Sequence, residues 1–116
     1  MSEDQWRELL EQERRRTQEQ IDSLRRDFDA VVEAALDSNA DDEHDPDGST
    51  IAFERSQVDA VLQQARRNLA EINAAQTRVE QGTYGTCENC GRPIAPARLE
   101  ARPVARTCIE CASASA

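Results

Sequence analysis

The stretch that decides the fold lies near the C-terminus and reads, from residue 84 to residue 111, YGTCENCGRPIAPARLEARPVARTCIEC. It contains all four cysteines of the chain, in two pairs with two residues between the partners of each pair: Cys87, Cys90, Cys108 and Cys111. Two such pairs can surround one tetrahedral zinc ion with four thiolates, each at ~2.3 Å. Gly85 and Gly91 flank the first pair, where glycine suits tight turns. We therefore predict one structural Zn2+ bound by all four cysteines.

Two other interpretations of the cysteines are a pair of disulfides and a redox-active dithiol. The sequence shows neither a signal peptide nor a run of the roughly 20 apolar residues that span a bilayer, so we expect a cytoplasmic protein without membrane contact. In a reducing cytoplasm, close cysteine pairs more often bind metal. Four cysteines also fill the coordination sphere and leave no position for a substrate. Because no Cys-His or Ser-His pairing and no phosphate loop appears, we expect that the protein is not an enzyme.

Residues 2–37 are predicted to form one long helix with a heptad seam. Ser2 and Gln5 fit a capping box, in which each side chain pairs with the other residue's backbone amide. Apolar residues and one threonine then recur at spacings of three and four: Leu10, Thr17, Ile21, Leu24, Phe28, Val31 and Ala35. This stripe predicts a helix that packs against one partner helix along its whole length.

A second long helix is predicted for residues 50–81. Its seam consists of five residues at seven-residue steps and two leucines in the alternate position: Ile51, Val58, Ala65, Ile72, Val79, Leu62 and Leu69. Arg55 and Gln76 interrupt the alternate position, and Gly82 is a typical helix stop.

Residues 38–49 lie between the two seams and contain Pro46, Gly48 and five acidic residues with no basic residue, a composition typical of a loop. Two seams of similar length joined by one short loop predict an antiparallel pair. We therefore expect a mainly α fold in two parts. Residues 1–81 would form a long antiparallel coiled-coil hairpin with an acidic tip loop, and residues 82–116 a small C-terminal four-cysteine zinc finger with a short tail.

Charge is distributed unevenly along the chain, whose net charge is −9. Residues 1–81 contain 20 acids and 10 arginines, a balance of −10, whereas residues 82–116 contain 3 acids and 4 arginines, a balance of +1. An acidic hairpin repels the phosphate backbone of nucleic acids, so we expect no direct sequence-specific DNA binding. A protein partner with a basic surface or channel is favoured instead.

The finger shows three sequence strings that are specific when they occur together: Tyr84-Gly85-x-Cys87-Glu88-x-Cys90-Gly91, then Arg98-Leu99-Glu100-Ala101-Arg102-Pro103, then Cys108-Ile109-x-Cys111. Together with the hairpin before them, they resemble the DksA/TraR family of C4-type zinc-finger transcription regulators. The resemblance implies direct binding to RNA polymerase without promoter DNA contact. The coiled coil would enter the secondary channel of the polymerase with its acidic tip near the active centre. Some members act together with guanosine tetraphosphate, which is therefore a possible ligand.

The resemblance places the functional tip at Asp42, Asp45 and Asp47. The family motif has two aspartates three positions apart and an alanine two positions later. Asp42 and Asp45 have this separation, with Asp47 at the alanine position. A second register, aligned on Asp45 and Pro46, places Gly48 at the second acid. Neither register matches fully.

Other interpretations of the acidic loop stay open. It is a solvated connection in the simplest case. A calcium loop is a further alternative, with Glu43, Asp45, Asp47, Gly48 and Glu54 at positions one, three, five, six and twelve of that pattern. The alternative function for the whole chain is a zinc-stabilised coiled-coil adaptor that binds another protein partner.

Overall fold

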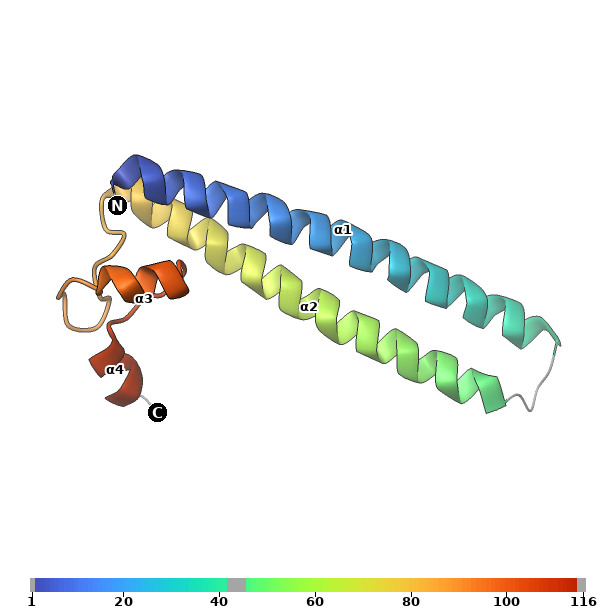
Figure 1. Ribbon diagram of the computed structural model, residues 1–116. Helices are drawn as coiled ribbons and strands as arrows, with labels where there is room; N and C mark the ends of the chain where they lie inside the picture. The colour runs from blue at the N-terminus through green and yellow to red at the C-terminus, as the bar shows by residue number, and fades with distance from the viewer. Residues whose placement is uncertain (1, 42–45, 115–116) are drawn as a thin grey trace. The chain divides into compact units, whose positions relative to one another are not determined.

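The computed structural model describes residues 2–41 and 46–114 and is mainly helical, as predicted (Figure 1). Its elements are α1 (Glu3–Asp41), α2 (Pro46–Gln81), α3 (Pro96–Ala101) and α4 (Ile109–Ala114). The long antiparallel pair α1 and α2 is followed by a small cysteine-rich module, and the part of the chain described contains no strand. No helix within that part is both long and apolar enough to cross a bilayer.

The structure divides into two compact units. One unit consists of residues 16–68, the central segments of the two long helices, and the other consists of residues 1–15 together with residues 69–116. The second unit therefore contains the first turns of α1, the last turns of α2 and the cysteine-rich module. The predicted boundary between a hairpin and a finger at residues 81 and 82 stays a prediction.

The two long helices extend further than the sequence pattern predicted. Helix α1 continues to Asp41 instead of residue 37, and α2 begins at Pro46 instead of residue 50. Proline breaks a helix interior, but it suits the first helical position because the amide it lacks has no partner there. Pro46 therefore starts α2. The expected loop at residues 38–49 is wrong for residues 38–41 and 46–49, which are helical, and residues 42–45 lie outside the described residues.

The predicted signals at the free helix ends are confirmed. The Ser2 amide donates to Gln5 Oε1 (2.6 Å) and the Gln5 amide to Ser2 Oγ (3.3 Å), so the capping box forms. At the end of α2, Gly82 adopts φ of +76°. The Thr83 amide donates to the Arg78 carbonyl (2.9 Å) and the Gly82 amide to the Val79 carbonyl (3.2 Å). This pair of bonds is a Schellman motif, which requires the left-handed residue.

The unit of residues 16–68 packs along the predicted heptad seam. Thr17, Ile21, Leu62 and Ala65 are buried. The seam becomes more exposed farther along the pair, where five of its residues are half-buried: Leu24, Phe28, Val31, Ile51 and Val58. The side chain of Ala35, also predicted in the seam, is not described.

The helix segments of the other unit pack around Leu10, Ala75 and Val79, which are nearly or completely buried. Next to them, Gln76 donates to Glu11 Oε2 (3.0 Å) across the two helices. The apparent interruption of the seam at Gln76 is therefore a polar contact between α1 and α2. Hydrogen bonds from Arg14 and Gln76 lower the pKa of Glu11 to about 2. The Glu11 carboxylate therefore stays ionised at neutral pH and keeps accepting the bond from Gln76.

Candidate metal centre

Two tight turns and a short helix carry the four cysteines. Cys87 and Cys90 lie between α2 and α3, where the Cys87 amide donates to the Arg92 carbonyl (2.8 Å) and the Gly91 amide to the Cys87 carbonyl (3.0 Å). Gly91 and Gly85 have φ of +74° and +81°, a conformation that residues with a Cβ rarely adopt. Cys108 precedes α4, and Cys111 lies in its first turn.

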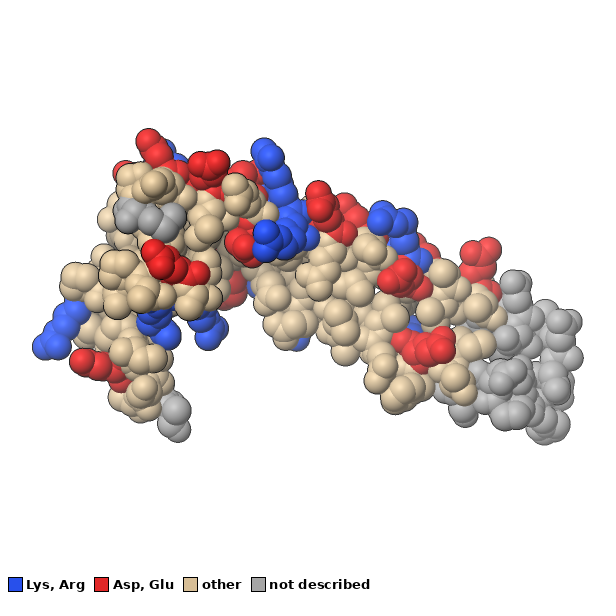
Figure 2. All heavy atoms as spheres, in the orientation of Figure 1, with Lys and Arg blue, Asp and Glu red and all other residues tan. Residues whose placement is uncertain are grey.

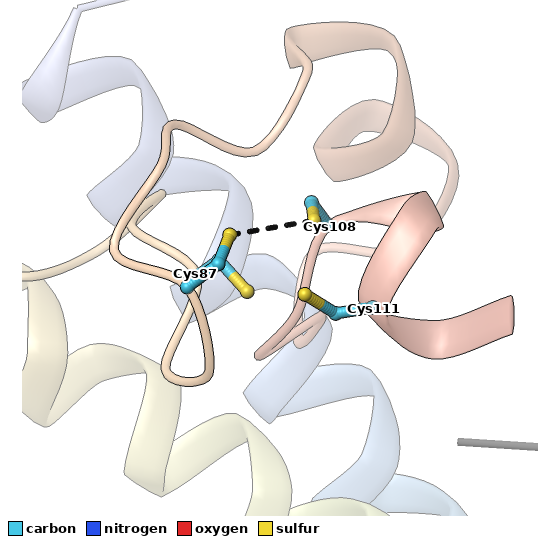
Figure 3. A group of neighbouring side chains, drawn as sticks. Cys87, Cys108 and Cys111 are labelled. Atoms are coloured by element: carbon cyan, nitrogen blue, oxygen red, sulfur yellow. Dashed lines mark hydrogen bonds between the residues drawn. The ribbon is translucent and has the colours of Figure 1, made fainter. Parts of the chain in front are cut away.

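The four sulfur atoms form one cluster. All four cysteines are free thiols, and their sulfurs lie within 4.8 Å of one another. The side chains of Cys87, Cys108 and Cys111 approach one another from two separate segments of the chain (Figure 3). The sulfurs of Cys90 and Cys108 are 3.8 Å apart, and a tetrahedral ion bound at about 2.3 Å would separate its sulfur ligands by about 3.8 Å. This geometry fits a four-thiolate metal site and contradicts a pair of disulfides.

The electrostatics of the cluster also fit a cation. The backbone amides of Cys108, Cys90 and Asn89 donate to the Cys87 sulfur, and they lower the pKa of that thiol to about 6. At Cys111 the Asn89 side chain lowers the pKa, but the neighbouring thiols and burial outweigh it and raise the pKa to about 12. Four adjacent thiols therefore cannot all ionise at neutral pH on their own. A divalent cation would stabilise all four thiolates together.

The cysteine cluster is covered by a small apolar core that includes the beginning of α1. Trp6, Cys87, Ile94, Leu99 and Ala105 are buried together, with exposed fractions of 8% or less. Cys108 and Cys111 pack against this core. From the sequence, Trp6 at the base of the hairpin is expected to pack against either the finger or the returning helix. The structure places it in the finger core, among residues about 80 to 100 positions away along the chain.

Residues 82–115 match the family described as the prokaryotic dksA/traR C4-type zinc finger. The chain is 33% identical over 94 residues to general stress protein 16O of Bacillus subtilis, covering 80% of this chain and 58% of that protein. It is 51% identical over 45 residues to the RNA polymerase-binding transcription factor DksA of Caulobacter vibrioides. The structure of transcription factor DksA2 from Pseudomonas aeruginosa superposes with a TM-score of 0.83, at 26% identity, over 97% of this chain and 81% of that one.

The finger is of the DksA/TraR C4 type. The match to Caulobacter DksA covers 39% of this chain and 32% of that protein, so the chain spans about a third to just over half the length of these two curated relatives. Within the DksA/TraR family the C4-type finger is a zinc site, and the sulfur cluster of this chain fits that metal. The metal of this centre is therefore one structural Zn2+.

An arginine ties the DksA/TraR finger to α2. Arg106 Nε donates to Glu71 Oε2 (3.0 Å), and Arg106 Nη1 donates to Glu88 Oε1 (3.2 Å) beside Cys87. The bond from Arg106 lowers the pKa of Glu71. The Glu88 amide also donates to the Arg106 carbonyl (2.9 Å), so this residue links both cysteine segments to the helix. Sequence reasoning missed Arg106 and Glu71, since no local pattern pairs residues 35 positions apart.

The predicted tip residues are only partly covered by the described structure. Asp42 and Asp45 lie outside the described residues, and Asp47 lies in the first turn of α2 with its side chain not described. For the calcium alternative, Glu43 and Asp45 also lie outside the described residues. Gly48, which would have to form the sharp turn of a calcium loop, is helical.

Tyr84 joins the finger core to the core between the helices, and its hydroxyl gives a first testable prediction. The hydroxyl donates to the Pro103 carbonyl (2.8 Å), and burial raises the pKa of Tyr84 to about 12, so it stays a donor. Tyr84→Phe keeps the ring, whose centroid lies 5.5 Å from that of Trp6. We expect the zinc-loaded variant to lose about 1 kcal/mol of unfolding free energy in urea titrations.

Thr83→Val is the matched control for that loss. It removes the neighbouring exposed hydroxyl, which makes a longer bond of 3.4 Å to the Arg78 carbonyl, and we expect a change of about 0.5 kcal/mol or less. Equal losses of unfolding free energy in the two variants would show that the hydrogen bond from Tyr84 to the Pro103 carbonyl does not stabilise the finger.

Proposed function

We propose that this protein is a zinc-binding transcription regulator that binds RNA polymerase directly. The observation that supports it best is the likeness to DksA2, a transcription factor, which extends over 97% of this chain and includes both long helices. The Caulobacter relative is named as RNA polymerase-binding, and the identity to it is high over a matched stretch of 45 residues. We therefore propose polymerase as the partner of this chain as well, acting as a binding protein and not as an enzyme.

In this proposal the zinc centre has a structural role. Cys87, Cys90, Cys108 and Cys111 are the proposed ligands, and they leave no coordination position for a substrate. The metal would hold the finger, proposed as residues 82–116, against the beginning of α1 and the end of α2. Residues 1–81 would act as the hairpin that reaches the partner.

The proposed contact to polymerase is made by the tip of the hairpin in the secondary channel. Asp42, Asp45 and Asp47 would supply negative charge there, as the family resemblance implies. A channel that admits nucleotides to a polymerase must attract anions, so an acidic hairpin suits it electrostatically. The balance of −10 over residues 1–81 supports contact with protein and opposes contact with promoter DNA. A response to guanosine tetraphosphate and a cytoplasmic location stay predictions.

The test is binding of the zinc-loaded protein to purified core RNA polymerase of its own host, with abortive initiation as the activity readout. A triple variant, Asp42→Asn, Asp45→Asn and Asp47→Asn, is compared with the parent. We expect both proteins to bind at micromolar concentration or better, and only the parent to change initiation. Binding to random duplex DNA should be weak and should lack the steep salt dependence of phosphate contacts.

The matched control neutralises three exposed acids of α1 far along the chain from the tip: Asp4→Asn, Glu8→Gln and Glu19→Gln. It changes the net charge by the same amount, so it should regulate initiation as the parent does. Regulation by the tip variant equal to that of the parent would contradict the tip mechanism. Absence of any polymerase binding by the parent would favour the adaptor function instead.

A further inference from the structure

One residue that is not a cysteine contacts the sulfur cluster twice. Asn89 lies between Cys87 and Cys90, in the turn that the Gly91 amide closes by donating to the Cys87 carbonyl (3.0 Å). Its backbone amide donates to the Cys87 sulfur, and its side-chain amide donates to the Cys111 sulfur. Asn89 therefore bonds to one cysteine of each pair.

The two sulfurs that Asn89 contacts come from segments that are distant in the sequence. Cys87 lies before α3 and Cys111 lies in the first turn of α4. Their side chains approach each other in the cluster (Figure 3), where all four sulfurs lie within 4.8 Å of one another. The Glu88 amide already links the first pair to the segment before Cys108, through the Arg106 carbonyl (2.9 Å). The Asn89 side chain adds a link at the far end of the second pair.

The charge of the centre makes such a donor favourable. Four thiolates carry more negative charge than one divalent cation neutralises, so hydrogen bonds to the sulfurs stabilise the complex and a nearby carboxylate destabilises it. The donors to Cys87 are backbone amides, which every residue except proline would supply. The donor to Cys111 is a side chain, so this bond depends on the amino acid at position 89. Space for a water or substrate at the metal is not needed for it.

We propose that Asn89 is a positioning residue of the zinc centre, which joins the two cysteine pairs and stabilises the thiolate of Cys111 through its side-chain amide. It tightens zinc binding and slows zinc release, while the cysteines alone supply the ligands. Loss of a hydrogen bond to a metal ligand typically weakens metal binding by about 10–100-fold. The role of Asn89 depends on the proposed ligand set and not on polymerase binding.

The test measures the zinc affinity of the full chain by competition with a chromophoric chelator. Asn89→Ala removes the donor, so we expect affinity about tenfold weaker or more and faster release of zinc to the chelator. Asn89→Asp keeps the size of the side chain and its capacity to form turns, but it places a carboxylate against the Cys111 sulfur. We expect a larger loss for Asn89→Asp than for Asn89→Ala. Asn89→Ser retains a shorter hydroxyl donor and should recover part of the affinity.

Two controls separate this effect from added charge and from loss of a ligand. Ala97→Glu adds the same charge at an exposed position of α3 and should bind zinc as the parent does. Co2+ bound in place of zinc reports the ligand set, because its visible absorption depends on tetrahedral thiolate coordination. We expect the absorption of a four-thiolate site in the parent and in each Asn89 variant.

The outcomes distinguish a role at the metal from a role in the turn. Asn89→Ala with the zinc affinity of the parent would overturn the proposal. Asn89→Asp that binds zinc as tightly as the parent would also overturn it, since Asn89 would then serve the turn alone. A parent whose bound Co2+ lacks four-thiolate absorption would refute the ligand set, and the role of Asn89 with it. None of these results depends on whether the chain binds polymerase.

Discussion

Removal of zinc is expected to release Trp6 from its core and to disorder the finger while the long helices stay helical. The finger has only four residues of its own in the buried core, and one of them is the ligand Cys87. Modules of this size rarely fold without a metal or disulfides. Structural zinc in such modules contributes about 10–16 kcal/mol of apparent binding free energy near pH 7, which is comparable to the whole stability of a small domain.

The chain provides its own reporter for this loss. Trp6 is the single tryptophan and is 8% exposed beside Cys87. Its fluorescence emission should shift to longer wavelength when a chelator removes the metal under reducing conditions, and should return when zinc is added back. The far-ultraviolet circular dichroism signal should change little, because α1 and α2 contain most of the helical residues.

Two substitutions control for indirect effects of chelation. Cys87→Ser removes one proposed ligand and should reproduce the shifted emission even in excess zinc. Glu110→Gln changes an exposed residue beside Cys111, whose ion pair with Arg92 is long at 3.9 Å, and it should leave the emission as in the parent. An unshifted Trp6 emission in the metal-free protein would show that the apolar core holds the finger without the metal.

The sequence predicted the parts of the fold that depend on local periodicity and on one rare residue type. The seven-residue steps predicted the buried seam residues, from Thr17 and Ile21 to Ala65 and Val79, because a helix that packs on one partner repeats its contacts at that interval. The two cysteine pairs predicted the sulfur cluster, because thiolates at this spacing serve one tetrahedral ion.

The contacts between distant segments could not be predicted in this way. Arg106 pairs with Glu71 and Glu88, yet arginine and glutamate are abundant in this chain and no spacing singles these three out. In the sequence of the second helix, Gln76 only interrupts the apolar seam. Its hydrogen bond can be seen only once the structure places Glu11 of the other helix opposite it. The sequence pattern ends the first long helix at residue 37 and begins the second at residue 50, whereas the structure has Asp41 and Pro46 at these ends. The pattern could not decide this, because Pro46 and Gly48 are compatible with both a loop and a first helical turn.

Trp6→Ala is expected to have the largest effect of any single substitution outside the cysteines. Truncation of a buried tryptophan usually costs about 3–5 kcal/mol. Here the loss falls on one unit, because Trp6 packs against Ile94, Leu99 and the ring of Tyr84, all in the unit of residues 1–15 and 69–116. Trp6→Phe keeps an aromatic ring at the site, so it should lose less than half as much.

Hydrogen exchange of single amides distinguishes this local effect from general destabilisation. Within the finger, the amides of Cys87, Glu88 and Ile94 are bonded to the carbonyls of Arg92, Arg106 and Gly85, and they should exchange much faster in the zinc-loaded Trp6→Ala protein. Amides of residues 20–34 belong to the other unit and should keep the parent's rates. Equal acceleration in both regions would mean that Trp6 stabilises the chain as a whole. The local result would mean that the first turns of α1 are part of the finger's own core, so that a finger expressed without them should fold poorly even with its zinc.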